Sequence, residues 1–156
     1  MKVPLAKPDI TQREIDAVVE VMKSGILSIG PKIEEFEKKV AEYVSVKYAV
    51  AVNSGTSALN LIVKALGIGK DDEVITTPFS FVASVNCFLM EGAKPVFVDI
   101  DPKTLNMNID EVEKHITPKT KAILAVDVFG QPINMKRLRE IADKHNLHLI
   151  EDSCEA

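Results

Sequence analysis

The chain has 156 residues, of which 46% are hydrophobic and 27% are charged, and its formal net charge is −4. This length allows one domain with a substantial hydrophobic core. The acidic balance without a basic patch argues against a nucleic-acid partner, and no apolar run approaches the length that spans a membrane. Residues 1–9 lack the apolar centre of a signal peptide, so we expect a cytoplasmic protein.

The cysteines and histidines predict no metal site. Cys87 and Cys154 form no CxxC pair, which favours reduced thiols. The three histidines, at positions 115, 145 and 148, do not have the spacing typical of zinc ligands.

Two amphipathic helices are predicted before residue 45. Thr11 and Glu14 fit a capping box, the apolar residues 15, 18, 19 and 22 share one face, and Gly25 follows as a plausible end. Pro31 suits the first position of the second helix, whose apolar face carries residues 33, 36, 40 and 43.

From residue 47 onward, strands and helices are predicted to alternate. The strands are expected at 47–52, 73–76, 95–100, 121–127 and 147–151, and the helices at 55–66, 80–91, 108–115 and 134–145. Alternation of this kind is typical of βαβ units with right-handed crossovers. Because the strands are continuously apolar, helices should cover both faces. The sequence therefore predicts an α/β fold with three αβα layers and a mostly parallel sheet.

The segment 53–58, Asn-Ser-Gly-Thr-Ser-Ala, joins the first of these strands to a helix. Backbone N–H groups and the positive end of the helix dipole converge there, so the loop is a candidate phosphate site. Gly55 would let the anion approach, and Thr56 and Ser57 would add hydroxyl donors. The alternative is an ordinary helix start with Ser54 or Thr56 as its N-cap.

Polar residues also follow the other predicted strands, at positions 76–77, 99, 127 and 151–152. Ligands of parallel α/β sheets bind beyond the carboxyl ends of the strands, so this edge is the expected site. Loops at strand ends are exposed to solvent and often polar, which would explain some of these residues. It would not explain why so many Asp and Glu residues lie at this one edge.

Several motifs, in this order and spacing, resemble one family. They are Ser24-Gly25, Gly30-Pro31, Phe36-Glu37, the segment 53–59, Asp72–Pro78, Phe81–Ser84, Gly92–Asp99, Val126–Pro132 and Ile150–Ser153. The chain resembles the N-terminal part of the DegT/DnrJ/EryC1/StrS sugar aminotransferases, which are pyridoxal-phosphate (PLP) enzymes of the aspartate-aminotransferase fold. The resemblance implies that residues 1–156 form the N-terminal portion of the large PLP-binding domain. A strand followed by an acidic turn is an unusual domain end, so we expect the rest of that domain and a small C-terminal domain beyond Ala156.

The resemblance implies a cofactor-binding role for six residues. Gly55, Thr56 and Ser57 match the loop that holds the PLP phosphate, and Phe81 matches the aromatic residue that stacks on the pyridine ring. From the residues alone, Phe81 fits better as a core residue of helix 80–91, and Phe79 is a weaker candidate for stacking.

Asp152 matches the acid that contacts the pyridine nitrogen and keeps it protonated; the alternative is a solvated turn acid. Glu155 stands near the cofactor where many members carry Gln or His. Asp127 stands where His is common in relatives, and a strand-end acid explains it equally well.

The resemblance places no catalytic residue in this chain. The lysine that forms the internal aldimine is expected beyond Ala156. The implied reaction is transamination of a nucleotide-linked keto sugar by a homodimer, with glutamate as amino donor. One alternative is a PLP- or PMP-dependent sugar 3-dehydrase with His at the lysine position, a branch that the 153–155 run resembles. Another is a phosphate- or nucleotide-binding module without chemistry.

Overall fold

The computed structural model describes residues 7–156, which divide into one unit that ends at Ala51 and a second unit over 52–156. In the first unit, α1 runs over Gln12–Ser24 and α2 over Pro31–Tyr43. The predicted capping box is confirmed, because Thr11 N donates to the Glu14 carboxylate over 2.7 Å. Gly25 ends α1 in the left-handed conformation, and Pro31 opens α2.

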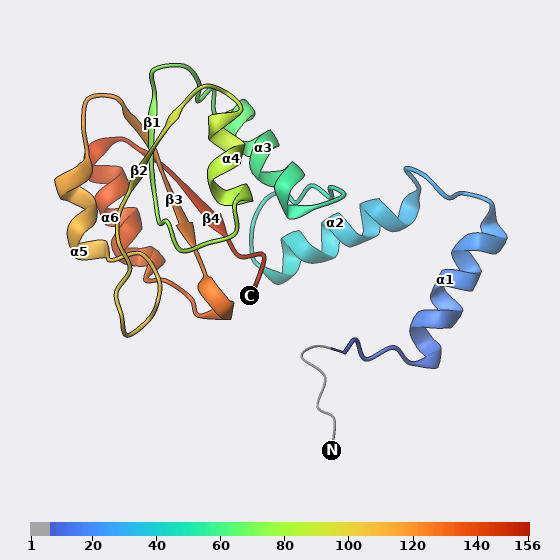
Figure 1. Cartoon of the computed structure of the whole chain (residues 1–156). Coiled ribbons are helices and arrows are strands. Elements are labelled where there is room, and N and C mark those ends of the chain that lie inside the picture. The colour runs from blue at the N-terminus through green and yellow to red at the C-terminus, as the bar shows by residue number, and fades with distance from the viewer. Residues whose placement is uncertain (1–6) are drawn as a thin grey trace. The chain divides into compact units, whose positions relative to one another are not determined.

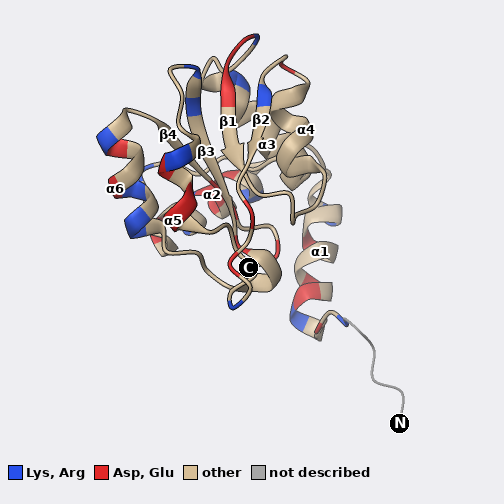
Figure 2. Cartoon of the chain, turned by 60° about the vertical axis from the view of Figure 1, so that its left-hand side comes forward, with Lys and Arg blue, Asp and Glu red and all other residues tan. Residues whose placement is uncertain are grey.

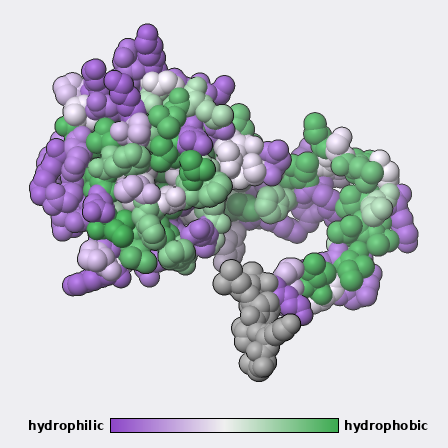
Figure 3. Space-filling view, viewed as in Figure 1, coloured by the Kyte–Doolittle hydropathy of each residue, from purple (hydrophilic) through white to green (hydrophobic). Residues whose placement is uncertain are grey.

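Neither helix of the first unit buries a residue, although both are amphipathic. In α1 the apolar side chains of Ile15, Val18 and Met22 are 48%, 60% and 65% exposed. Figure 3 shows hydrophobic side chains at the surface along this helix. Among the described residues, no helix is both long and apolar enough to cross a bilayer.

The strand predicted at 47–52 is wrong. These residues pair with no strand in the described part of the chain, and Tyr48 and Val50 are more than 70% exposed. An apolar, β-branched run becomes a strand only where a neighbouring strand takes up its backbone N–H and C=O groups. The sequence pattern shows the preference but not the partner.

The second unit is built on a four-stranded parallel sheet (Figure 1). Its strands are β1 (Glu73–Thr76), β2 (Lys94–Phe97), β3 (Thr120–Val126) and β4 (His148–Asp152), in the spatial order β2-β1-β3-β4. All three pairings are parallel. The chain first adds a strand on one side of β1 and then returns to add two on the other side. The junction of β1 and β3 is therefore the switch point, where ligands of such sheets bind beyond the carboxyl ends.

Helices cover both faces of the sheet, as the apolar strands predicted. On one face α3 (Gly55–Ala65) and α4 (Ala83–Leu89) pack over β1, β3 and β4 in a core centred on Phe88. On the other face α5 (Ile109–Val112) and α6 (Met135–His145) enclose a second core that contains Ile75 and Ile123. Short 3-10 turns, η1 (Glu113–His115) and η2 (Val128–Gly130), complete the unit.

Charged residues lie on the outer surfaces of α5 and α6 (Figure 2). Arg137 of α6 bridges to Asp110 of α5, and Lys144 of α6 bridges to Glu113 over 2.8 Å. Both pairs are largely exposed, so solvent and salt screen them and they contribute little to the stability of the fold. The packing of the second core positions these two helices.

The helix predicted over 80–91 is shorter than expected, and Phe81 is not a core residue. The α4 helix begins at Ala83, and Phe81 lies before it with 72% of its side chain exposed. The apolar period of this segment is real, because Ala83, Cys87 and Phe88 are buried. Residues 78–81, between β1 and α4, instead lie at the carboxyl edge of the sheet.

Asn146 ends α6 in the left-handed conformation, with φ 54° and ψ 45°. Asparagine tolerates this region better than other residues with a Cβ atom, and glycine adopts it without strain. We expect Asn146→Ala to lower the free energy of unfolding by about 1 kcal/mol and Asn146→Gly to leave it unchanged or higher. Urea denaturation of the two variants and the parent checks this. Equal losses in both variants would show that the side-chain contacts of Asn146 matter rather than its φ angle.

Candidate functional site

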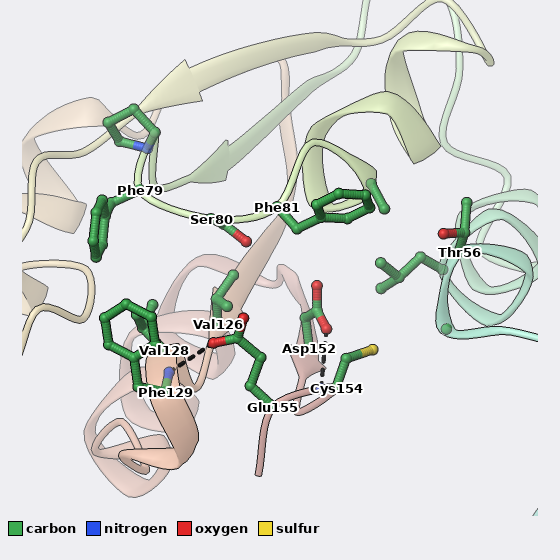
Figure 4. Close-up of a pocket in the computed structure, with 14 residues that line it drawn as sticks. Thr56, Phe79, Ser80, Phe81, Val126, Val128, Phe129, Asp152, Cys154 and Glu155 are labelled. Carbon is green, nitrogen blue, oxygen red and sulfur yellow. Dashed lines mark hydrogen bonds between the residues drawn. The ribbon is translucent and has the colours of Figure 1, made fainter. Parts of the chain in front are cut away.

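A cavity of about 400 Å³ opens at the carboxyl edge of the sheet, beside the switch point (Figure 4). Four stretches of the chain line it: the start of α3, the segment between β1 and α4, the end of β3 with η2, and the residues that end and follow β4. The lining residues are Gly55, Thr56, Leu59, Pro78, Phe79, Ser80, Phe81, Ala83, Val126, Val128, Phe129, Asp152, Cys154 and Glu155. Polar atoms of Thr56, Ser80, Asp152 and Glu155 thus meet a mainly apolar wall, which is the usual composition of a small-molecule site.

Asp152 is the last residue of β4, and the residue is only 7% exposed. The register pairs Asp152 with Val126 at the end of β3, so the pairing of the two strands fixes the position of the Asp152 backbone at the edge of the cavity. Its Oδ2 accepts a hydrogen bond of 2.7 Å from Ser84 Oγ, and its Oδ1 accepts one of 3.3 Å from the amide of Cys154. A buried carboxylate is costly unless such donors or a cation compensate it. Asp152 is therefore a buried acceptor and not the solvated turn acid of the alternative interpretation.

The first turn of α3 faces the cavity from another side. Ser54 caps the helix, since its Oγ accepts from the amide of Ser57 over 3.1 Å. The amides of Gly55 and Thr56 donate no hydrogen bond to any residue that the structure describes. Both residues line the cavity, whereas Ser57 does not. Two free N–H groups at a helix N-terminus beside a cavity suit an anionic ligand group.

Gly55 has no room for a side chain. A Cβ atom built on it would lie 2.4 Å from Cys154 Sγ. The start of α3 and the chain after β4 therefore approach each other at a glycine, and a larger residue would displace the Cys154 side chain or one of these segments.

Three phenylalanines line the cavity. Phe81 is 72% exposed, Phe129 is 71% exposed, and Phe79 is 41% exposed. Phe79 and Phe129 contact each other edge to face, with ring centroids 6.0 Å apart and planes at 83°. Figure 4 shows that Phe81 stands apart from this pair, on the side of Asp152 and Thr56. Because its face is not covered by another ring, Phe81 is the phenylalanine that offers a free surface near Asp152.

Glu155 holds the loop after β3. Its Oε2 accepts from the amide of Phe129 over 2.8 Å, and Phe129 has the left-handed φ of 55°. At Gly130, with φ 77°, a Cβ atom would lie 3.0 Å from the carbonyl oxygen of Glu155. The carboxylate of Glu155 thus stabilises a strained turn in the cavity wall.

Asn106, which is 2% exposed, also holds the loop after β3 through hydrogen bonds of its side chain to the loop backbone. Asn106 Oδ1 accepts from the amide of Val128 over 3.0 Å, and its Nδ2 donates to the carbonyl of Gln131 over 2.7 Å. The backbone of the loop that carries Phe129 is therefore held by hydrogen bonds from both Glu155 and Asn106.

Asp127 does not line the cavity. It is 3% exposed, and both of its carboxylate oxygens are occupied: Oδ1 accepts from the amide of Ile133 over 2.9 Å and Oδ2 accepts from Ser153 Oγ over 2.6 Å. These contacts favour the interpretation of Asp127 as a strand-end acid that shapes the loops.

Five of the six residues chosen as cofactor contacts lie around one cavity: Gly55, Thr56, Phe81, Asp152 and Glu155. Sequence reasoning missed Ser80, Phe129 and Cys154. Their only signal was their place just beyond strand ends, where the loops of the site had to lie. Ser80 belongs to the loop after β1, Phe129 to the loop after β3 and Cys154 to the loop after β4.

The two thiols should differ in reactivity. Burial raises the pKa of Cys87 to about 11, and the negative charge of Asp152 adds to this. Hydrogen bonding to Asp152 raises the pKa of Cys154, which is exposed. Alkylation requires the thiolate, so a raised pKa means slower labelling at a given pH. We expect iodoacetamide to modify Cys154 first, at a rate that still increases above pH 9, and Cys87 only after unfolding.

Mass spectrometry of peptides labelled across a pH series checks this expectation. In Asp152→Asn the pKa of Cys154 should fall, so labelling at pH 8 should become faster. Labelling of Cys87 before Cys154, or a Cys154 rate that ignores Asp152, would contradict it.

The fold and the cavity together define a parallel α/β unit in which the start of α3 and a buried acid face the same space. The sequence profile of the DegT/DnrJ/EryC1/StrS aminotransferase family matches residues 8–156. The chain belongs to this family.

Two curated relatives illustrate the similarity. The chain is 46% identical over 153 residues to the spore coat polysaccharide biosynthesis protein SpsC of Bacillus subtilis, with 98% of this chain and 39% of SpsC covered. It is 45% identical over 156 residues to the GDP-perosamine synthase of Caulobacter vibrioides, with 99% of this chain and 42% of that protein covered.

Solved structures show the same fold. An aminotransferase from Psychrobacter cryohalolentis superposes with a TM-score of 0.92 at 41% identity, over 98% of this chain and 40% of that one. The E. coli GDP-4-keto-6-deoxy-D-mannose-3-dehydratase with bound hydrated PLP superposes with a TM-score of 0.93 at 32% identity, over 99% of this chain and 41% of that one. The chain thus spans about 40% of the length of these relatives.

Proposed function

We propose that this chain forms the N-terminal, cofactor-binding portion of a PLP-dependent aminotransferase that acts on a nucleotide-linked keto sugar, with glutamate as amino donor. The observation that carries the proposal is the buried carboxylate of Asp152, which faces a cavity of about 400 Å³ whose opposite wall is the start of α3. The activity of the family and the nucleotide sugar in the name of the Caulobacter relative support it. A cytoplasmic homodimer is part of the same proposal.

The residues present fit PLP. A phosphate needs N–H donors without an internal partner, and Gly55 and Thr56 offer two at a helix N-terminus. A pyridinium nitrogen needs an acceptor, and Asp152 is a buried carboxylate with no salt bridge to any residue that the structure describes. The exposed ring of Phe81 offers a flat apolar surface between these two groups.

When bound, PLP supplies an electron sink for carbanion chemistry. The residues of this chain would bind and orient it. Gly55 and Thr56 would hold the phosphate with their amides, and Phe81 would fix the plane of the ring. Asp152 would hold a proton on the ring nitrogen, and the apolar residues Leu59, Val126 and Val128 would keep water from the ring. The lysine that moves the substrate proton belongs, in this proposal, to sequence beyond Ala156.

One observation favours a second candidate, a PLP-dependent sugar 3-dehydratase. The dehydratase structure of E. coli covers 99% of this chain at a TM-score of 0.93, as high as that of the aminotransferase. The two reactions would use the same portion of the site, so the residue at the lysine position separates them.

The test uses the full natural protein that contains this sequence. After addition of PLP, the visible spectrum is recorded, the protein is reduced with borohydride, and modified peptides are mapped. A phosphopyridoxyl group on a lysine beyond Ala156, together with glutamate-dependent amination of a nucleotide keto sugar, is the expected result. Bound PLP without a modified lysine would favour the dehydratase. A protein that does not bind PLP would overturn both and leave a phosphate- or nucleotide-binding module.

A further inference from the structure

A row of hydroxyl groups leads from the cavity to the buried carboxylate of Asp152. Ser80 lines the cavity, and its Oγ lies 2.7 Å from Ser84 Oγ. Ser84 is completely buried on α4, and its Oγ lies 2.7 Å from Asp152 Oδ2. Ser84 and Asp152 are 68 positions apart in the sequence, so the packing of α4 against the end of β4 creates this contact.

The chemistry of the three groups fixes the direction of these hydrogen bonds. An ionised carboxylate only accepts, so the single hydrogen of Ser84 points to Asp152. Ser84 Oγ can then only accept from its other neighbour, which makes Ser80 the donor of the second bond. The hydrogen of Ser80 is thereby used, and only its oxygen lone pairs remain for a ligand. Ionised Asp152 and Ser80 thus both present acceptors to the cavity.

Neutral donors have to stabilise Asp152, because no cationic side chain of residues 7–156 lines the cavity that it faces. The titratable groups around it are Cys87 of α4, Cys154 and Glu155 after β4, and Asp127 after β3. None of the cavity-lining residues is a lysine, arginine or histidine. Ser84 donates to Asp152 over 2.7 Å, and the amide of Cys154 makes a longer bond of 3.3 Å. The Cys154 thiol is the other neutral side-chain donor beside Asp152.

We propose that Ser84 is a positioning residue that keeps Asp152 ionised and oriented toward the ligand, and that through this bond it makes Ser80 an acceptor. The inference rests on the proposed function, because the ligand it concerns is the pyridinium ring at Asp152. It adds that the cavity recognises a ligand with two donors on this side. One is the protonated ring nitrogen facing Asp152, and the other is an N–H or O–H group facing Ser80.

The test measures the affinity of pyridoxamine 5′-phosphate for the full natural protein from pH 5 to pH 9. This probe binds without a covalent bond to lysine, so the identity of the lysine position does not affect the result. Ser84→Ala removes only one oxygen from the core. We expect affinity near pH 7 to fall about tenfold, as for a lost hydrogen bond to a charged group. The acid limb of the pH profile, below which affinity is lost, should move up, because a hydrogen bond that favours the charged carboxylate is removed.

Ser153→Ala is the matched control. Ser153 also donates to a buried aspartate at a strand end, with 2.6 Å between its Oγ and Asp127 Oδ2, but neither residue lines the cavity. It should leave the affinity and its pH profile unchanged even if it lowers stability. Ser80→Ala leaves the bond from Ser84 to Asp152 in place, so its acid limb should move less than that of Ser84→Ala.

An unchanged pH profile in Ser84→Ala would overturn the inference. An equal displacement in Ser153→Ala would also overturn it, because a general loosening of the sheet edge would then explain the effect. Failure of the proposed function has a different result: the parent protein itself would not bind pyridoxamine 5′-phosphate.

Discussion

Replacing Asp152 with asparagine is expected to reduce the rate of the PLP-dependent reaction at least about 100-fold, the usual cost of removing a preorganised electrostatic group. Asparagine has the same shape and can still accept from Ser84, so the fold should survive. The substitution removes the negative charge that would keep the pyridine nitrogen protonated. The measurement is kcat in the full natural protein, together with the visible spectrum of bound PLP.

Glu151→Gln is the matched control, since it makes the same chemical change one position earlier on β4. Burial raises the pKa of Glu151, with Asp127 adding to the effect, but Glu151 does not line the cavity. It should keep kcat and the spectrum within about twofold, as expected for a site away from the chemistry. If Asp152→Asn had no larger effect than Glu151→Gln, Asp152 would not be the partner of the ring nitrogen.

The second large effect is expected at Gly55. In Gly55→Ala the new Cβ would lie 2.4 Å from Cys154 Sγ, so the Cys154 side chain, the start of α3 or the chain after Asp152 must move. Overpacking of this kind costs about 2 kcal/mol. The free protein relieves this strain by displacing the walls of the cavity, so a ligand that needs the original geometry should lose up to the same free energy, or roughly 30-fold in the affinity for pyridoxamine 5′-phosphate. Equilibrium titration checks this value.

A double-mutant cycle identifies the cause. Cys154→Ala removes the sulfur atom, and the Cβ of residue 154 lies 3.8 Å from the added atom, so Gly55→Ala/Cys154→Ala should recover most of the affinity. Gly69→Ala is the control, because its added Cβ meets only Glu91 O at 3.4 Å, outside the cavity. A double variant as weak as Gly55→Ala would mean that the contact with Cys154 is not the reason.

The sheet of the second unit could be predicted because its signals are local and strong. Continuous apolar runs marked β1, β3 and β4, and helical periods marked α3 and α6 within a residue or two of their observed ends. The same signals failed at 47–52, where strand formation depends on a partner that the sequence pattern does not identify. They also failed at Phe81, because the apolar period of α4 says little about where its first turn begins.

The candidate site could be predicted only in part, for a related reason. Gly55 is indicated by its place at a helix start, and Asp152 by its place at a strand end together with the family resemblance. Phe129 is not indicated in this way, because its left-handed turn depends on Glu155 and on the buried Asn106, 23 positions earlier in the chain. The hydroxyl contact between Ser84 and Asp152 is equally non-local. Such pairs follow from tertiary packing and leave no periodic signal.

The cavity is assembled from four stretches that begin at Gly55 and end at Glu155, so it exists only when β1, β3 and β4 are all paired. A ligand of this cavity therefore binds the folded chain and not the unfolded one. By mass action, a ligand at 100 times its dissociation constant stabilises the fold by about 2.7 kcal/mol. Thermal stability and resistance to proteolysis should thus increase with the concentration of the cofactor. In a cell, the amount of this protein would follow the supply of its cofactor, because the occupied form is degraded more slowly.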